Sequence, residues 1–232
     1  HLDMAAICAK IAHLSDLHFG PPRAICVDLD NWSFGYPRAF DLTILEKWAN
    51  HVAAERVDLV IVSGDIVNNP RPKYLRKSLE FLTDLLNKCG LDKSRLVVCP
   101  GNHDVALLGN FGFKPVTSLL FFRSFGFWLE RRWFFDPRLR LFVYWFDSNP
   151  PRFSDFARGE VIADEVHLFS RTVSELFRNY GTEFALAFKV AVLHHHPLPL
   201  PYTGSDKLLM LDRAGTFLVE MKDIPAGEAL GK

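Results

Sequence analysis

The sequence predicts an α/β domain built on an at least partly parallel sheet. In the first half of the chain, short apolar runs alternate with amphipathic segments of helix length, and connections of this length imply right-handed crossovers between parallel strands. Of the 232 residues, 49% are hydrophobic and the formal net charge is zero, so a substantial core is expected and disorder is not. One large domain over residues 5–232 fits this length. Residues 1–4 are interpreted as left over from cloning.

The first half of the chain holds the clearest alternation of strands and helices. The uniformly apolar run at Val57–Ser63 is expected to be a strand buried on both faces of the sheet. Gly90 follows a helical stripe of leucines and is expected to end that helix. The expected elements are, in order, a strand at Ile7–Ser15, a helix at Leu42–Glu55, a strand at Val57–Ser63, a helix at Pro72–Cys89 and a strand at Leu96–Pro100.

The stretch Gly109–Asp136 is dense in Phe and Trp, with arginines interleaved. Within it, Ser118–Trp133 is expected to be a helix with aromatic side chains on more than one side. The favoured interpretation is a helix buried against the sheet. The alternative is a cap that presents an apolar wall to a substrate or a membrane surface.

The second half of the chain continues the alternation less regularly. A proline-rich loop at Pro197–Gly204 cannot be regular structure, and a last helix is expected after it. The expected elements are a strand at Leu139–Phe146, a helix at Ala163–Tyr180, a strand at Phe184–Leu193 and a helix at Asp206–Met221.

Composition also narrows the class of protein. Zero net charge argues against a dominant nucleic-acid footprint, and no apolar run approaches the roughly 18 residues of a membrane span. The first residues lack the pattern of a secretion signal. No C-x-x-C spacing occurs, so reduced thiols in a cytoplasmic protein are expected. The four cysteines are Cys8, Cys26, Cys89 and Cys99.

Polar side chains follow four of the expected strands at the point where each strand ends. Ligand sites of open α/β sheets lie at the carboxyl ends of the strands, so these side chains are candidates for one site. Carboxylate, amide oxygen and imidazole are the usual ligands of Zn, Mn and Fe, which predicts a metal site. The residues are Asp16 and His18, then Asp65, then Asn102, His103 and Asp104, and finally His194, His195 and His196.

Taken singly, most of these motifs have a purely structural explanation. Asp16-x-His18 is a common pattern, and Asp65 could be the N-cap of a following helix. The histidine run could be a core histidine beside surface ones, which is a fair explanation for one residue and a poor one for three. Gly101-Asn102-His103-Asp104 is more specific, because an amide beside an imidazole has few purely structural uses.

Taken together and in this order, the four motifs resemble the calcineurin-like metallophosphoesterase family. The matching segments are Asp16-Leu17-His18, Gly64-Asp65-Ile66-Val67-Asn68, Gly101-Asn102-His103-Asp104 and His195-His196-Pro197. The resemblance spans the chain from about residue 10 to residue 200. It implies a two-sheet β-sandwich flanked by helices, an α-β-β-α fold, with the site on one rim.

The resemblance also implies two divalent transition-metal ions, with Mn²⁺ favoured and Fe, Zn, Ni or Co as alternatives. Asp16 and His18 would bind the first ion, Asn102 and His195 the second, and Asp65 would bridge both. A shared carboxylate offsets the repulsion between two close cations. His195 is preferred over His194 because the family ligand is typically followed by x-Pro.

The catalytic roles follow from the same resemblance. A hydroxide between the metals would be the nucleophile, its pKa lowered by the ions. His103 would contact the phosphoryl group and stabilise or protonate the leaving oxygen, and Asp104 would orient His103. The expected activity is hydrolysis of a small phosphoester, with a diester favoured over a monoester or a nucleic acid.

One departure from the family pattern affects these expectations. The family ends its metal set with a G-H-x-H motif, which does not occur in this sequence. Truncation at the C-terminus and a natural departure both explain this, and either removes one ligand from each metal. A scaffold that has lost turnover is therefore the alternative to an enzyme. Partial metal occupancy and self-association through an exposed sheet edge are further expectations.

Overall fold

The computed structural model describes residues 9–20, 42–68, 70–105, 114–149, 159–197, 211–212 and 214–223. Predictions that concern Cys8, Cys26 and residues 109–113 and 198–210 lie outside these ranges. Among the described residues, no helix is both long and apolar enough to cross a membrane. Cys89 and Cys99 are free thiols.

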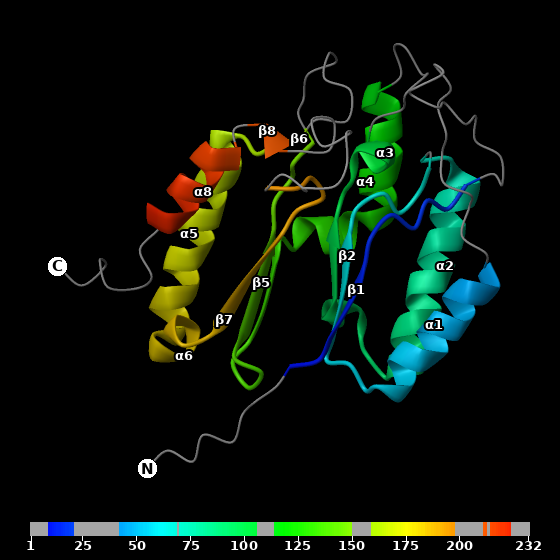
Figure 1. Ribbon diagram of the computed structural model, residues 1–232, viewed down its shortest axis with the longest axis horizontal. Helices are drawn as coiled ribbons and strands as arrows, with labels where there is room; N and C mark the ends of the chain where they lie inside the picture. Colours follow the sequence, from blue (N-terminus) through cyan, green and yellow to red (C-terminus); the bar gives the residue numbers. More distant parts are fainter. Residues whose placement is uncertain are drawn as a thin grey trace.

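The first sheet is fully parallel. It contains β1 (Ile11–Leu14), β2 (Leu59–Ser63) and β3 (Leu96–Cys99), in that spatial order. Every residue of the central strand β2 is buried, as its uniformly apolar sequence predicts. Figure 1 shows α1 (Leu42–Ala54) and α2 (Pro72–Cys89) side by side along the outer face of this sheet.

The limits of α2 follow directly from the sequence. Pro72 stands at its first position, where a missing N–H costs no helical hydrogen bond. Gly90 closes the helix in the left-handed conformation, with φ of 66°, and its N–H bonds back to the last turn. The short 3₁₀ turn η1 (Lys93–Arg95) then leads into β3, and α3 (Asn102–Val105) follows β3.

The second sheet is mixed. It contains β4 (Trp133–Asp136), β5 (Leu141–Trp145) and β7 (Phe188–Val192) in the order β4-β5-β7, with β4 antiparallel and β7 parallel to β5. In Figure 1 the helices α5 (Ala163–Tyr180), α6 (Thr182–Ala185) and α8 (Ala214–Asp223) lie on the outer side of this sheet. A separate parallel pair joins β6 (Gly159–Glu160) to β8 (Leu211–Asp212).

Side-chain alternation along β5 shows why the two sheets form a sandwich. Val143 and Trp145 join the core that the first sheet also lines. Tyr144 and Phe146 point the other way, and their rings lie 4.8 and 5.2 Å from the ring of Phe169 on α5. Each face of β5 is thus covered, once by the opposite sheet and once by a helix. The predicted α-β-β-α sandwich of two sheets flanked by helices is confirmed.

The aromatic stretch is mainly α4 (Lys114–Glu130), which packs beside β3. Phe121 and Phe125 are fully buried and their rings stack with centroids 4.7 Å apart. Leu119 and Phe127 are exposed on the same helix. The described part of this stretch therefore joins the core through one face and presents the other to solvent.

Among the element boundaries that differ from the sequence-based expectation, three have a plain structural reason. Trp133 starts β4 instead of ending a helix, because it pairs with Tyr144 in the second sheet. Phe184 belongs to α6, where its buried ring packs inward, and the strand starts only at Phe188. The predicted helix at Asp206–Met221 is wrong at Leu211 and Asp212, which form β8, and α8 starts at Ala214.

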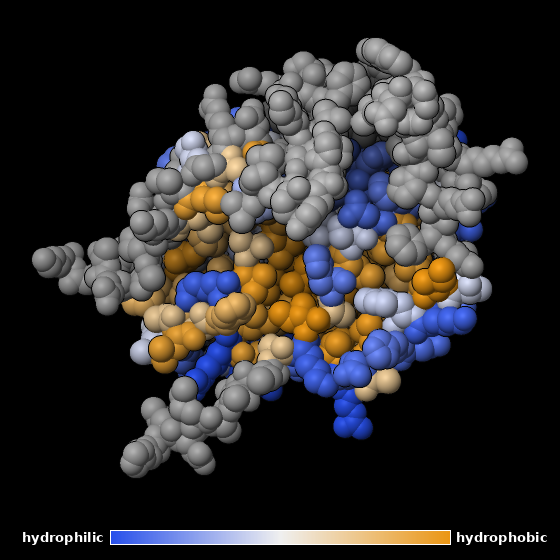
Figure 2. Space-filling view, viewed as in Figure 1, coloured by the Kyte–Doolittle hydropathy of each residue, from blue (hydrophilic) through white to orange (hydrophobic). Residues whose placement is uncertain are grey.

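Apolar side chains also reach the surface at the open side of the sandwich. Figure 2 shows them gathered across the middle of one face, where β7 and β1 run in Figure 1. Phe188 on β7 is 72% exposed and Ile11 on β1 is 37% exposed. Self-association through a sheet edge stays a prediction.

Candidate metal centre

Three of the predicted site residues adopt a backbone conformation that L-residues seldom take. The φ angles of Asp16, His18 and Asp65 are 56°, 47° and 51°. A non-glycine residue in the left-handed region costs about 1–3 kcal/mol, and such strain clusters at functional sites. Two backbone hydrogen bonds hold these turns together, from Asp16 N to Gly64 O at 3.1 Å and from His18 N to Asp65 O at 2.8 Å.

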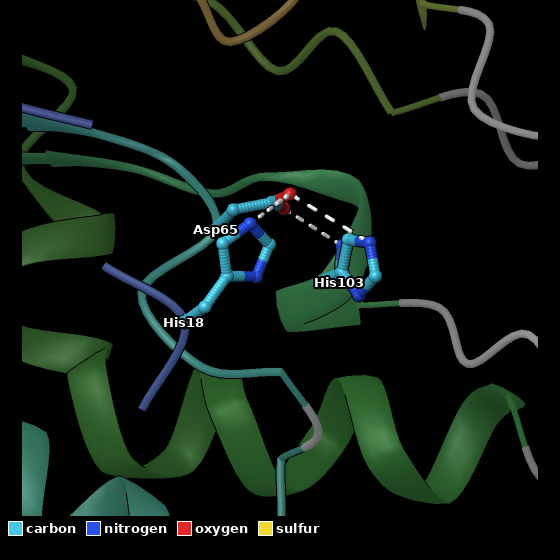
Figure 3. Close-up of side chains that lie close together, drawn as sticks. All are labelled: His18, Asp65 and His103. Atoms are coloured by element: carbon cyan, nitrogen blue, oxygen red, sulfur yellow. Dashed lines mark hydrogen bonds and ion pairs between the residues drawn. The ribbon is translucent and has the colours of Figure 1, made fainter. Parts of the chain in front are cut away.

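Asp65 lies at the centre of the cluster that results, as Figure 3 shows. Its Oδ2 is 3.7 Å from His18 Nε2 and 3.9 Å from His103 Nε2, and its Oδ1 accepts the backbone N–H of His103 at 2.9 Å. The two imidazole rings meet edge to face with centroids 4.9 Å apart. Asp65 is therefore not the N-cap of α2, which begins after Arg71.

On its other side, the Asp65 carboxylate faces a histidine from the second sheet. His194 Nε2 is 3.4 Å from Asp65 Oδ1 and 3.0 Å from Asn102 Oδ1. Its Nδ1 lies 2.9 Å from the carbonyl oxygen of Ser63, which can only accept, so Nδ1 is the donor. A metal-binding histidine usually donates its second ring nitrogen in this way, which leaves Nε2 directed at the ligand position.

Two glycines of the sequence motifs are required by the close packing of this cluster. A Cβ on Gly101 would lie 2.2 Å from the backbone nitrogen of Asp65, and one on Gly64 would lie 2.5 Å from Nδ1 of His194. Gly64 also has a φ of 91°, which disfavours any L side chain. The glycines therefore allow the backbone of one strand end to approach the side chains of the next.

Asp65 and His194 change each other's pKa because their charges are close together. Burial alone would raise the pKa of the Asp65 carboxyl, yet the hydrogen bond and charge of His194 hold it down at about 2. Burial alone would lower the pKa of His194, but Asp65 raises it to about 9. The carboxylate thus stays anionic, which is the form that binds cations, and an ion bound at His194 would displace its proton.

Asp104 acts on the backbone of the site. Its carboxylate is fully buried and accepts N–H groups from Gly101 at 2.9 Å, Val67 at 2.9 Å and Ile66 at 3.2 Å. Burial and the charge of Asp65 raise the pKa of Asp104 to about 7, against the lowering by these three bonds. Asp104 therefore ties the turn that carries Asn102 and His103 to the turn that carries Asp65.

His195 lies outside the cluster. Its ring is buried, with Nδ1 2.8 Å from the hydroxyl oxygen of Ser148, and a Cβ on Gly159 would lie 2.2 Å from its Cγ. The structure thus brings together Asp16, His18, Asp65, Asn102 and His103 with His194, which sequence reasoning ranked below His195.

Strand alternation carries the signal that points to His194. Val192 of β7 faces the core shared with the first sheet, whereas Leu193 packs with the cluster beside α5. Side chains alternate along an extended segment, so His194 continues the face of Val192 and His195 continues that of Leu193. The face of β7 decides which histidine meets Asp65, and the x-Pro spacing does not reveal it.

The donor set fits divalent metal ions. Ligand atoms of His18, Asp65 and His103 lie within 4.8 Å of one another, as do those of Asp16, Asp65 and His194. Asp65 belongs to both groups, which is what a carboxylate shared by two ions requires. Carboxylate and imidazole ligands together suit ions such as Mn²⁺, Fe²⁺ and Zn²⁺.

The chain is similar to phosphoesterases of known sequence and structure. A family model described as calcineurin-like phosphoesterase matches residues 9–221. A probable cyclic nucleotide phosphodiesterase from Coxiella burnetii is 26% identical over 215 residues, covering 88% of this chain and 67% of that protein. Among solved structures, a dimetal phosphatase from Danio rerio shares the fold with a TM-score of 0.57 and 13% identity, covering 92% of this chain and 77% of that one.

Proposed function

The chain belongs to the calcineurin-like phosphoesterase family, and we propose that it hydrolyses phosphodiesters with the help of two divalent transition-metal ions. The observation that carries the proposal is the position of Asp65. Its carboxylate lies between the imidazoles of His18 and His103 on one side and that of His194 on the other. A single buried carboxylate with donors on both sides suits two cations better than one, because it offsets their repulsion.

The proposed ligands divide between the two positions. Asp16, His18 and Asp65 hold one ion, and Asp65, Asn102 and His194 hold the other. The support for this division is that His18 Nε2 lies 3.7 Å from both Asp16 and Asp65, while His194 Nε2 lies within 3.4 Å of both Asp65 and Asn102. His194 takes the place that the sequence motif suggested for His195.

The bound ions would lower the pKa of water and neutralise charge on the phosphoryl group. The protein supplies the rest of the chemistry. His103 is proposed as the group that contacts the phosphoryl oxygens and gives a proton to the leaving oxygen. Its backbone N–H is fixed on Asp65 and its ring packs against His18, so the imidazole is held next to the carboxylate that would bind the ions.

A diester is the proposed substrate class because of the relative from Coxiella burnetii, whose name describes a probable cyclic nucleotide phosphodiesterase. A cyclic nucleotide is an internal phosphodiester, so a small diester of this kind is the first substrate to examine. Zero net charge also gives no general attraction for a long nucleic acid.

Turnover of paired chromogenic substrates tests the proposal. Metal-stripped protein is reloaded with Mn²⁺ and assayed with bis(4-nitrophenyl) phosphate, 4-nitrophenyl phosphate and 3′,5′-cyclic AMP. We expect metal-dependent hydrolysis of the diesters, loss of activity with EDTA, and little activity in His194→Ala. His196→Ala is the matched control from the same histidine run and should keep its activity.

Two outcomes would contradict the proposal. Faster hydrolysis of the monoester would make the protein a phosphatase, which keeps the metal centre and changes the substrate class. Tight binding of two ions without turnover of any phosphoester would instead indicate a binding scaffold.

A further inference from the structure

A short loop after β5, residues 147–149, joins the two sheets beside the metal centre. Asn149 donates from Nδ2 to the carbonyl oxygen of Pro100 at 3.0 Å. Pro100 follows β3 of the first sheet and immediately precedes the turn that carries Asn102 and His103. Asn149 itself comes from the second sheet, so this hydrogen bond crosses from one sheet to the other at the edge of the site.

The same loop fixes the histidine run. The Ser148 hydroxyl is fully buried and lies 2.8 Å from Nδ1 of His195, with the backbone nitrogen of His195 3.5 Å from the same oxygen. Gly159 leaves no room for His195 to move in its direction, since a Cβ there would overlap the ring. A fixed His195 fixes the direction of its neighbour His194, because adjacent side chains of an extended segment point to opposite sides.

Charged side chains also hold the loop in place. The backbone N–H of Asp147 donates to Oε2 of Glu165 at 3.2 Å, and Glu165 is paired with Arg132. The Arg132 guanidinium lies 4.5 Å from the ring centre of Trp145 at the end of β5. Asn149 N in turn donates to Oδ1 of Asp147 at 2.9 Å. The loop is therefore anchored independently of the metal centre and can act as a rigid spacer.

We propose that Ser148 and Asn149 are positioning residues that set the distance between Asn102 on the first sheet and His194 on the second. These two side chains meet at 3.0 Å although they come from different sheets, so their spacing depends on links between the sheets. The inference rests on the proposed function, in which this pair and Asp65 hold one of the two ions. Loss of the hydrogen bond of either Ser148 or Asn149 weakens the binding of that ion, whereas the ion at Asp16 and His18 stays bound.

Metal titration separates this role from a merely structural one. Metal-free wild-type protein and the variants Asn149→Ala and Ser148→Ala are titrated with Mn²⁺ by calorimetry, and their unfolding by urea is measured alongside. We expect Kd for one of the two ions to rise about 10–100-fold, the usual effect of removing a group that orients a ligand. Kd for the other ion should stay within about threefold of wild type, a change of well under 1 kcal/mol.

Ser78→Ala is the matched control. Ser78 is also fully buried, and its hydroxyl donates to a backbone carbonyl, that of Leu75 within α2 at 2.9 Å. Its loss should lower the free energy of unfolding about as much as the loss of the Ser148 hydroxyl, with both Kd values unchanged. Asn149 is only partly buried, so Asn149→Ala keeps the test available if Ser148→Ala does not fold.

Three results would overturn the inference. The variants could bind both ions as wild type does and lose only stability, like Ser78→Ala. They could instead lose both ions equally, which would indicate a general distortion of the site. Wild-type protein that binds fewer than two ions would overturn the proposed function, and this inference with it.

Discussion

The two sheets contribute to the metal centre in different ways. The first sheet supplies side chains from three neighbouring strand ends, and backbone hydrogen bonds join those ends to one another. Among the described residues, the second sheet supplies His194, which reaches the others through its ring nitrogens. The residues from the first sheet, which form the first half of the site, are thus positioned by their own backbone hydrogen bonds. The position of His194, in the second half of the site, depends on how the two sheets are held together.

The difference assigns separate tasks to the two halves. A carboxylate that accepts backbone N–H groups, such as Asp65 or Asp104, is held in place by the protein's own hydrogen bonds. A ligand delivered from a second layer can be displaced by small changes far from the ion. Variants at Asp104, which holds the backbone of the first-sheet part, should therefore affect folding, while variants at the links that hold His194 should affect the affinity for one ion.

The largest expected effect is on turnover in His103→Ala. We expect kcat to fall by about 10²–10⁴-fold, the usual contribution of a positioned acid or base. Metal content, measured by elemental analysis, should stay at the wild-type level because the proposed ligands are untouched. Equal losses of metal and rate would show that His103 is a metal ligand. The proposed assignment of ligands to the two ions would then have to include it.

Asp104→Ala is expected to have the next largest effect, on folding. It leaves three buried backbone N–H groups without their acceptor, so the free energy of unfolding should fall by roughly 2–4 kcal/mol. Asp84→Ala is the control, because it removes only a surface pair with Lys88 on α2. Urea unfolding that shows similar losses for both variants would contradict the scaffolding role of Asp104.

His194→Ala and His195→Ala compare two neighbours in the second half. His194→Ala should raise Kd for one ion by at least about 10–100-fold, the effect typical of losing an orienting residue, because it removes a proposed ligand. His195→Ala should raise Kd for the same ion less. It should lower the free energy of unfolding more, because the His195 ring is buried against Ser148. The reverse order in a Mn²⁺ titration would restore His195 as the ligand.

The smallest expected effect lies at the other end of the second sheet. Asp136, where β4 turns into β5, accepts Arg95 Nη2 at 2.7 Å and the backbone N–H of Arg138 at 2.9 Å. Burial alone would raise the pKa of Asp136, but these bonds hold it below its usual range. Asp136→Asn should lower the free energy of unfolding by about 1 kcal/mol at pH 7, with both ions bound as in wild type.

The stabilisation that Asp136 provides depends on pH. A carboxyl with a lowered folded-state pKa stabilises the protein above its unfolded pKa of about 4, and that contribution is lost as pH falls through the folded value. The difference between wild type and Asp136→Asn should therefore shrink in acid unfolding. A difference that stays constant below pH 4 would show that the charge of Asp136 contributes nothing.

The contrast between the halves also explains what the sequence could predict. Gly64-Asp65 and Gly101-Asn102 are recognisable as short motifs, although each glycine makes room for a residue that is distant in the chain, Gly64 for His194 and Gly101 for Asp65. The ends of α2 are local signals in the strict sense, because Pro72 and Gly90 themselves mark them. The two ends of α2 were predicted correctly from neighbouring residues alone.

Features that depend on distant parts of the chain were harder to predict. The choice between His194 and His195 depends on which face of β7 meets the first sheet. Leu211 has an apolar neighbourhood that suits a helix, but its pairing with Gly159 makes it a strand. In each case the deciding contact joins residues more than 40 positions apart, which periodicity within a short window does not contain.

The metal content of Asp65→Asn tests the central claim most directly. Asp16→Asn is its matched control, since it also removes one carboxylate charge but from a residue proposed to touch one ion. Both variants and wild type are loaded with Mn²⁺, desalted and analysed for metal per chain. We predict that wild type retains the most metal, that Asp16→Asn loses mainly one ion, and that Asp65→Asn loses both. Wild-type metal content in Asp65→Asn would contradict the shared carboxylate on which the proposed two-ion centre depends.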